Sequence, residues 1–129
     1  MVRIGHRGED GLTSTELAVV MPVLIALVLV PFQIALWWHA YQVADAAARE
    51  AVDAAQVVTA TEDDGIRAAH WFLDAAGNLT EPEVTVTRST ETVSVEVTGR
   101  APRLLPGFDW QVTARAAAPI ERFIPEPDR

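Results

Sequence analysis

A single carboxylate, Glu16, stands at the start of the longest apolar run in the sequence. No Asp, Glu, Lys or Arg occurs between Leu17 and Ala44, so Glu16 is the last charge before that run. A carboxylate carried into apolar surroundings without a partner is costly, which favours either a helix-capping role or an ion pair at this position. Thr13 lies three residues earlier, and this spacing predicts a capping box at a helix start.

Little in the rest of the chain resembles the chemistry of a catalytic or metal-binding site. There is no Cys, and the three His residues are isolated from one another, without metal-ligand spacing. The acidic run 62–64 lacks the spaced oxygen ligands of a calcium loop. No nucleophile–base set or phosphate-binding loop is apparent in the sequence. We therefore predict no enzyme activity, no cofactor and no metal, and the net charge of −8 argues against nucleic acid as a partner.

The apolar run predicts a transmembrane helix. A bilayer core of about 30 Å needs roughly 20 helical residues, and the stretch Leu17–Trp38 reaches that length. The aromatic cluster of Trp37, Trp38 and Tyr41 at the far end is typical of the headgroup level of a membrane, so we place the span at about residues 17–41. Pro22 and Pro31 lie inside it as candidate kinks.

The placement of basic residues predicts the orientation. Arg3 and Arg7 precede the run, and the first basic residue after it is Arg49, which favours an N-terminus inside and a C-terminal domain outside. The ten basic residues are all Arg, in an Ala-rich chain, as is typical of GC-rich bacterial genomes. We therefore expect a single-pass protein of the bacterial cytoplasmic (inner) membrane.

Beyond the membrane the periodicity predicts an α+β domain. The long helix is expected to continue to about residue 60, because the stretch 43–57 consists of good helix formers. A second helix starts at Thr61, with an apolar stripe at helical spacing, and ends at Gly77 and Asn78. Alternating Val residues at 84–86 and 93–97 predict a hairpin, and residues 110–116 add a third antiparallel strand. The two helices are expected to cover the apolar face of this sheet.

Residues 7–22, RGEDGLTSTELAVVMP, resemble the TadE-like pseudopilins of the tight-adherence (Flp-type) pilus machinery. The matching marks are Gly11, Glu16 five residues later, the apolar run and Pro22. The resemblance implies cleavage between Gly11 and Leu12 by a prepilin peptidase, which would make residues 1–11 a leader, residues 12–60 the mature N-terminal helix and residues 61–129 an extracytoplasmic, pilin-like domain.

The resemblance also implies how the subunit would work. Gly11 leaves the backbone open to a protease cleft, and cleavage creates a new amine on Leu12. The Leu12 amine of an adjacent subunit could then pair with Glu16 and set the register between helices. The expected partners are the membrane, the prepilin peptidase and other pilin or pseudopilin subunits, in an oligomer that could reach a cell-surface pilus and act in adhesion.

The sequence departs from the major Flp pilins in two ways. Leu17 stands where those pilins commonly carry Tyr directly after the Glu, and about 70 residues follow Ala60, where the major pilins are very short. Both differences favour a pseudopilin or minor pilin over a major filament subunit.

Three questions stay open at this point. The chain could be a permanently anchored, single-pass extracytoplasmic binding module, with the helix as a tether only. A signal peptidase could instead release a secreted domain near Ala46. Trp71 falls opposite the apolar stripe of the second helix, so it is either an exposed contact residue or covered by the sheet or the long helix.

Overall fold

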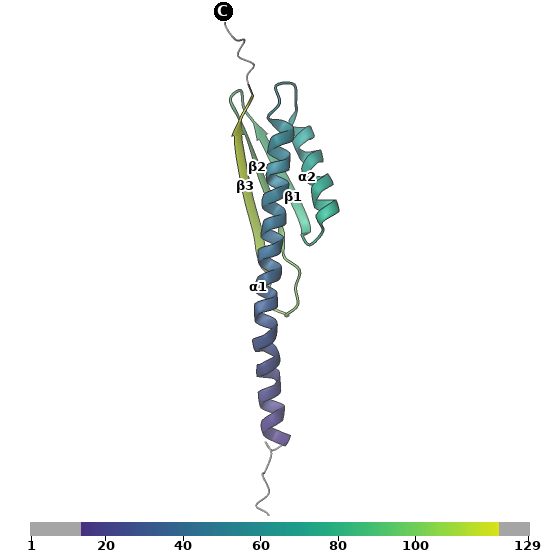
Figure 1. Ribbon diagram of the computed structural model, residues 1–129, viewed down its shortest axis with the longest axis vertical. Helices are drawn as coiled ribbons and strands as arrows, with labels where there is room; N and C mark the ends of the chain where they lie inside the picture. The colour runs from purple at the N-terminus through teal and green to yellow at the C-terminus, as the bar shows by residue number, and fades with distance from the viewer. Residues whose placement is uncertain (1–13, 122–129) are drawn as a thin grey trace, which may run out of the picture.

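The computed structural model describes residues 14–121 and consists of one very long helix, a short helix and a small sheet (Figure 1). The long helix α1 covers Ser14–Ala55, and α2 covers Glu62–Ala76. The strands are β1 (Thr80–Arg88), β2 (Thr92–Arg100) and β3 (Gln111–Pro119). This arrangement confirms the predicted α+β class, with a long N-terminal helix, a second helix and a three-stranded antiparallel sheet.

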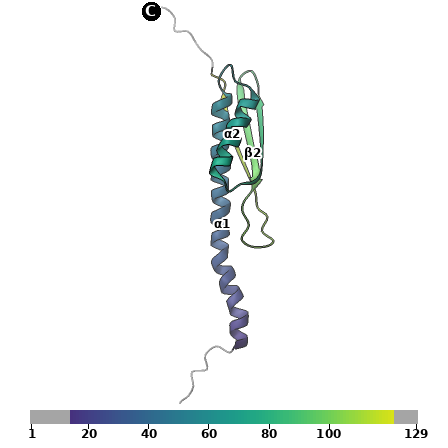
Figure 2. The same cartoon turned by 90° about the vertical axis from the view of Figure 1, so that its right-hand side faces the viewer.

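The sheet is an antiparallel meander in the order β1-β2-β3. Val95 of β2 lies opposite Val86 of β1 and Ala116 of β3, so the alternating Val residues share one face. That face is buried, whereas the opposite face carries Thr, Ser and an ion pair between Arg115 and Glu96. Figure 2 shows α1 and α2 together on one side of the sheet. The helices therefore cover the apolar face only, as the alternation predicted.

The core is built from small side chains. On α1 the buried residues are mostly Ala, which allows the helix to approach the sheet and α2 closely; the sheet contributes Val and α2 contributes Ala69 and Leu73. The buried apolar residues of α1 are Ala40, Val43, Ala44, Ala47, Ala48, Ala51, Val52 and Ala55. All of them lie in the C-terminal part of α1, so only that part belongs to the domain core.

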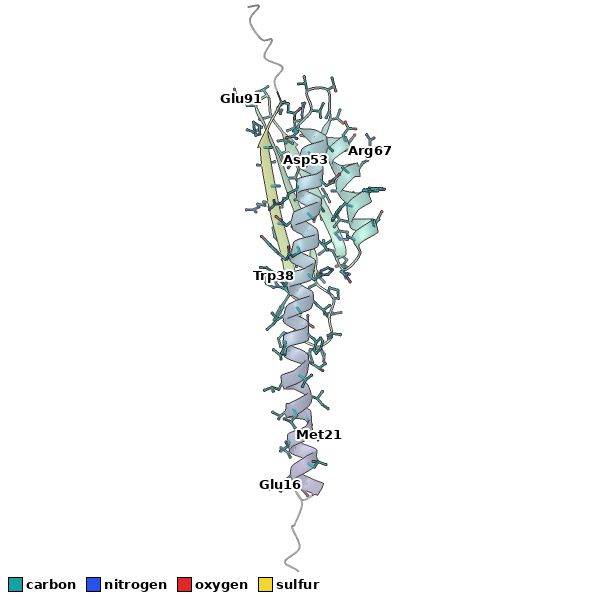
Figure 3. All side chains as sticks on the ribbon, viewed as in Figure 1. Glu16, Met21, Trp38, Asp53, Arg67 and Glu91 are labelled. Atoms are coloured by element: carbon teal, nitrogen blue, oxygen red, sulfur yellow. The ribbon has the colours of Figure 1, made fainter. Side chains whose placement is uncertain are left out.

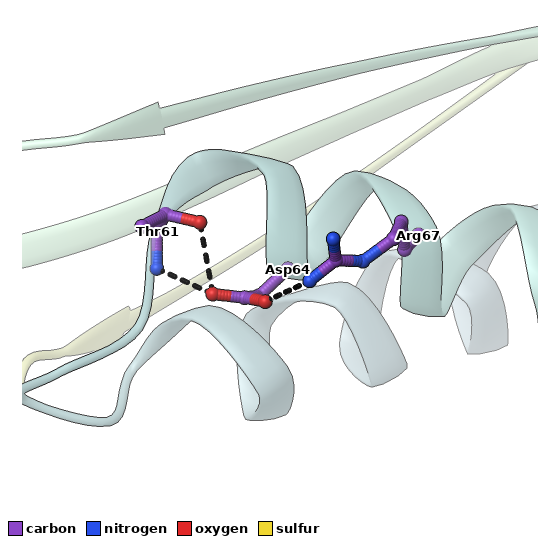
Figure 4. A network of polar contacts seen from close by, with 3 residues as sticks. All are labelled: Thr61, Asp64 and Arg67. Atoms are coloured by element: carbon purple, nitrogen blue, oxygen red, sulfur yellow. Dashed lines mark hydrogen bonds and ion pairs between the residues drawn. The ribbon is translucent and has the colours of Figure 1, made fainter.

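The start of α2 is fixed by a polar network around Asp64 (Figure 4). The Asp64 carboxylate accepts hydrogen bonds from the backbone N–H and the hydroxyl of Thr61, both at 2.8 Å, and it also pairs with Arg67. These hydrogen bonds, first the one from the Thr61 backbone and then the one from its hydroxyl, lower the pKa of Asp64, with the charge of Arg67 adding to them. Thr61 thus begins the helix as predicted, and Gly77 ends it with φ +63° and a backbone hydrogen bond to Leu73.

The C-terminal end of α1 is capped by a residue from the sheet. Arg88 of β1 donates from Nε to the carbonyl of Ala55 at 3.1 Å, and from its terminal nitrogen to the carbonyls of Val57 and Val58. The last carbonyls of a helix have no partner within the helix and carry partial negative charge, so a guanidinium suits them. The helix ends at Ala55, slightly earlier than the predicted residue 60.

Candidate membrane and assembly site

The N-terminal half of α1 projects away from the domain and contacts little else within the described residues (Figure 1). Every side chain from Leu17 to Phe32 is exposed except Leu29, which is partly buried. This half is apolar on all sides, and α1 is long and apolar enough to cross a membrane, with 6% of its most apolar window buried. A helix that is apolar all round needs apolar surroundings, so this half requires lipid or other apolar helices around it.

Both prolines lie inside this helix without interrupting it. Pro22 and Pro31 are part of the continuous α1, which curves in its N-terminal half (Figure 2). The helix therefore curves in the region of the two prolines, and it does not break at either of them.

Glu16 lies in the first turn of α1, at the end of the molecule farthest from the sheet (Figure 3). Its carboxylate is placed where it complements the positive end of the helix dipole. The predicted cleavage residues Gly11 and Leu12, and the capping residue Thr13, lie outside the described residues.

The aromatic cluster at the far end of the apolar run is larger than the sequence predicted. Trp37 stacks on Tyr41 with ring centroids 6.3 Å apart, and Trp38 lies next to both. Trp37 also meets Trp110 edge to face at 6.3 Å, and Trp110 in turn meets Phe108 at 5.4 Å. The cluster therefore joins α1 to the loop between β2 and β3 at the base of the domain.

Gln33, which lies within the predicted transmembrane span, holds the same loop against α1 by hydrogen bonds. Its side chain is 1% exposed, donates from Nε2 to the carbonyl of Pro102 at 3.1 Å and accepts from the backbone N–H of Leu104 at 2.8 Å. The amide is thus satisfied by two backbone groups of the loop, which compensates for its burial in apolar surroundings.

The sequence analysis did not single out Gln33, Phe108 or Trp110. One signal was available, since Gln33 is the only amide side chain in the stretch 17–38 and a polar group there needs a partner. The identity of the partner could not be predicted, because it consists of main-chain groups about 70 positions further along the chain.

The remaining predicted residues fall on exposed surfaces. Trp71 is 70% exposed on α2, so neither the sheet nor the long helix covers it. Across residues 14–121, no three His, Asp or Glu side chains gather in a group that could hold a metal ion.

A protein-family model described as TadE-like protein matches residues 11–53. The match confirms the resemblance and includes Gly11, Glu16 and nearly all of α1. The match covers about a third of the chain, and α1 is long and apolar enough for a single membrane pass. No curated protein and no solved structure matches the chain significantly.

Proposed function

We propose that this chain is a pseudopilin or minor pilin-like subunit of a tight-adherence pilus or a related secretion machine. The observation that carries the proposal is the fully apolar, projecting half of α1, which falls within the part of the chain that matches the TadE-like family. Such a helix can lie first in a bilayer and later among the helices of other subunits. The role is assembly, without enzyme activity.

The proposal also assigns the processing and the membrane topology of the chain. A prepilin peptidase cleaves between Gly11 and Leu12 and removes the leader 1–11. The mature helix crosses the inner membrane with its N-terminus inside, and residues 61–129 form the extracytoplasmic domain. The compact packing of α2 and the sheet against the C-terminal half of α1 supports a folded unit held at the membrane by the N-terminal half.

Glu16 is the proposed assembly residue. In an apolar bundle of helices its carboxylate needs a cation, and the new amine of Leu12 on a neighbouring subunit supplies one at the same level. The ion pair between Glu16 of one subunit and the Leu12 amine of its neighbour would then fix the axial register of adjacent helices. The surrounding apolar side chains would supply the packing.

The absence of Cys in the sequence allows a direct test of assembly. Leu27→Cys places one thiol on the projecting half, where Leu27 is 69% exposed, and Val58→Cys places one in the exposed turn between the helices, where Val58 is 59% exposed. We expect cross-links from position 27 to other pilin-like subunits in the host membrane, and fewer cross-links when Glu16→Ala is added. Equal cross-linking with and without Glu16→Ala would contradict the pairing, and no cross-links at position 27 would contradict assembly through the helix.

The second candidate is a permanently anchored extracytoplasmic binding module. Trp71 favours it, because a Trp that is 70% exposed on a helix is the type of residue that anchors protein contacts. A retained N-terminus together with a ligand-binding outer domain would favour this candidate over the pseudopilin.

Release of a secreted domain near Ala46 is disfavoured by the packing. Ala44 and Ala47 are fully buried in the core, so cleavage at that point would cut α1 within the domain. It would also remove Ala40 and Val43 from the core.

A further inference from the structure

The loop between β2 and β3, residues 101–110, reaches down along α1 below the sheet (Figure 2). Two hydrogen bonds to the amide of Gln33 and the contact between Trp110 and Trp37 hold it there. The loop is therefore fixed against the helix at the level of Gln33, rather than extending freely into solvent.

The length of the apolar run gives the position of this level relative to a membrane. Counted from Leu17, a bilayer core of about 30 Å takes roughly 20 residues of helix and ends near Leu36. Gln33 then lies about 5 Å inside the edge of the apolar core, since each residue adds about 1.5 Å.

The side chains at the tip of the loop suit that position. Leu104 is 52% exposed and Phe108 is 36% exposed, although the Leu104 backbone binds Gln33 of α1 and the Phe108 ring contacts Trp110. Arg103 beside them is exposed and can extend its guanidinium outward to the phosphates of lipid headgroups while its stem stays among apolar groups. Asp109, the acidic residue of the loop, is paired with Arg100 at 3.5 Å.

We propose that this loop is a second membrane contact, which inserts Leu104 and Phe108 into the lipid interface on the side of the domain and places Arg103 at the phosphates. The proposal rests on the proposed function only in taking α1 as membrane-spanning. Ile34 on the adjoining helix, 49% exposed, lines the same surface hollow as Trp37 and Trp110 and so adds to the apolar surface beside the loop. With both α1 and the loop in contact with lipid, the distance of the domain from the bilayer and its rotation about the axis of α1 are fixed before any assembly.

The test uses the full chain in phospholipid vesicles with single thiols, each labelled with a polarity-sensitive fluorophore. Leu104→Cys probes the loop, Leu27→Cys probes the span, and Thr90→Cys, in the exposed turn between β1 and β2, is the matched control. We expect blue-shifted emission at positions 104 and 27, with loss of intensity when nitroxide-labelled lipids are present. The label at position 90 should keep the emission it has in water.

Each other outcome is decisive. If position 27 reports lipid and position 104 reports water, the loop proposal is wrong while the spanning helix stands. If neither position reports lipid, the membrane placement itself fails. If position 104 is shielded from water but not quenched by nitroxide lipids, the loop is covered by protein, and the lipid partner is overturned.

Discussion

Arg88 shows how one side chain can connect two elements. It comes from β1, yet its guanidinium binds three carbonyls at and beyond the end of α1. Hydrogen bonds from a charged donor contribute more than neutral ones, and loss of this donor removes the side-chain hydrogen bond of the part-buried Ala55 carbonyl. Neither the position nor the partners of Arg88 could be predicted from sequence, because the carbonyls that it binds have no side-chain signature.

Arg88→Ala is expected to lower the free energy of unfolding by about 1–3 kcal/mol. Chemical denaturation of the full chain in detergent micelles measures the change. The matched control is Arg49→Ala, which removes an exposed ion pair to Asp45 on α1 and should cost no more than about 0.5 kcal/mol. Equal losses for the two variants would contradict the capping role of Arg88.

Asp64 makes a pH-dependent contribution to stability. Its pKa is lowered in the folded protein by the hydrogen bonds from Thr61, so the folded state prefers the ionised carboxylate more than the unfolded state does. The contribution is therefore complete above the unfolded pKa of about 4 and is lost as the pH falls through the folded value.

Asp64→Ala should consequently lower the melting temperature by several degrees at pH 6, and the difference from wild type should shrink as the pH falls toward 3. Asp63→Ala is the matched control, since it removes a carboxylate from the same turn without affecting the Thr61 network. Melting curves across this range measure both differences. A difference for Asp64→Ala that stays constant with pH would show that the charge is not what stabilises the helix start.

At the scale of elements, α1 and α2 pack closely because Gly65 has no side chain. A Cβ at this position would lie 2.9 Å from the carbonyl oxygen of Ala51, 3.1 Å from the Cβ of Ala55 and 3.3 Å from a methyl carbon of Val86. The first of these neighbours is backbone and cannot move without shifting the helix. The close contact between the two helices therefore depends on glycine at this point of α2.

Gly65→Ala should destabilise the domain by about 1–3 kcal/mol, although Ala is the better helix former by about 1 kcal/mol. The control Asp74→Ala, at an exposed position of the same helix, gains helix propensity without a clash and should be neutral or slightly stabilising. Chemical denaturation of both variants measures the sign of each change in the free energy of unfolding. A more stable Gly65→Ala protein would mean that the helices can separate at little cost.

The elements themselves could be predicted because their signals are local. The long apolar run, the stripe around Ala69 and Leu73 and the alternating Val residues of β2 each lie within one continuous stretch. The attachment of residues 101–110 to Gln33 depends instead on folding of the whole sheet, which brings the loop down beside α1. For the same reason the sequence predicted Trp37, Trp38 and Tyr41 as a cluster but not Phe108 and Trp110.

At the scale of the whole molecule, one helix of 42 residues performs two tasks. At about 1.5 Å per residue it is about 63 Å long, and only its C-terminal half is built into the domain. The N-terminal half presents apolar side chains on all sides and carries Glu16 in its first turn. A folded domain on an apolar, projecting helix is suited to insertion in a bilayer and to packing against the same helix of other subunits.

Cleavage after Gly11 is proposed to precede assembly through the N-terminal half of α1. Intact mass and N-terminal sequence of the protein purified from the membranes of its own host test this most directly, with a Gly11 substitution as control. The account predicts an N-terminus at Leu12 and loss of that product when Gly11 is changed. An N-terminus at Met1 or Val2 in the wild-type protein would contradict it and leave α1 as a plain anchor.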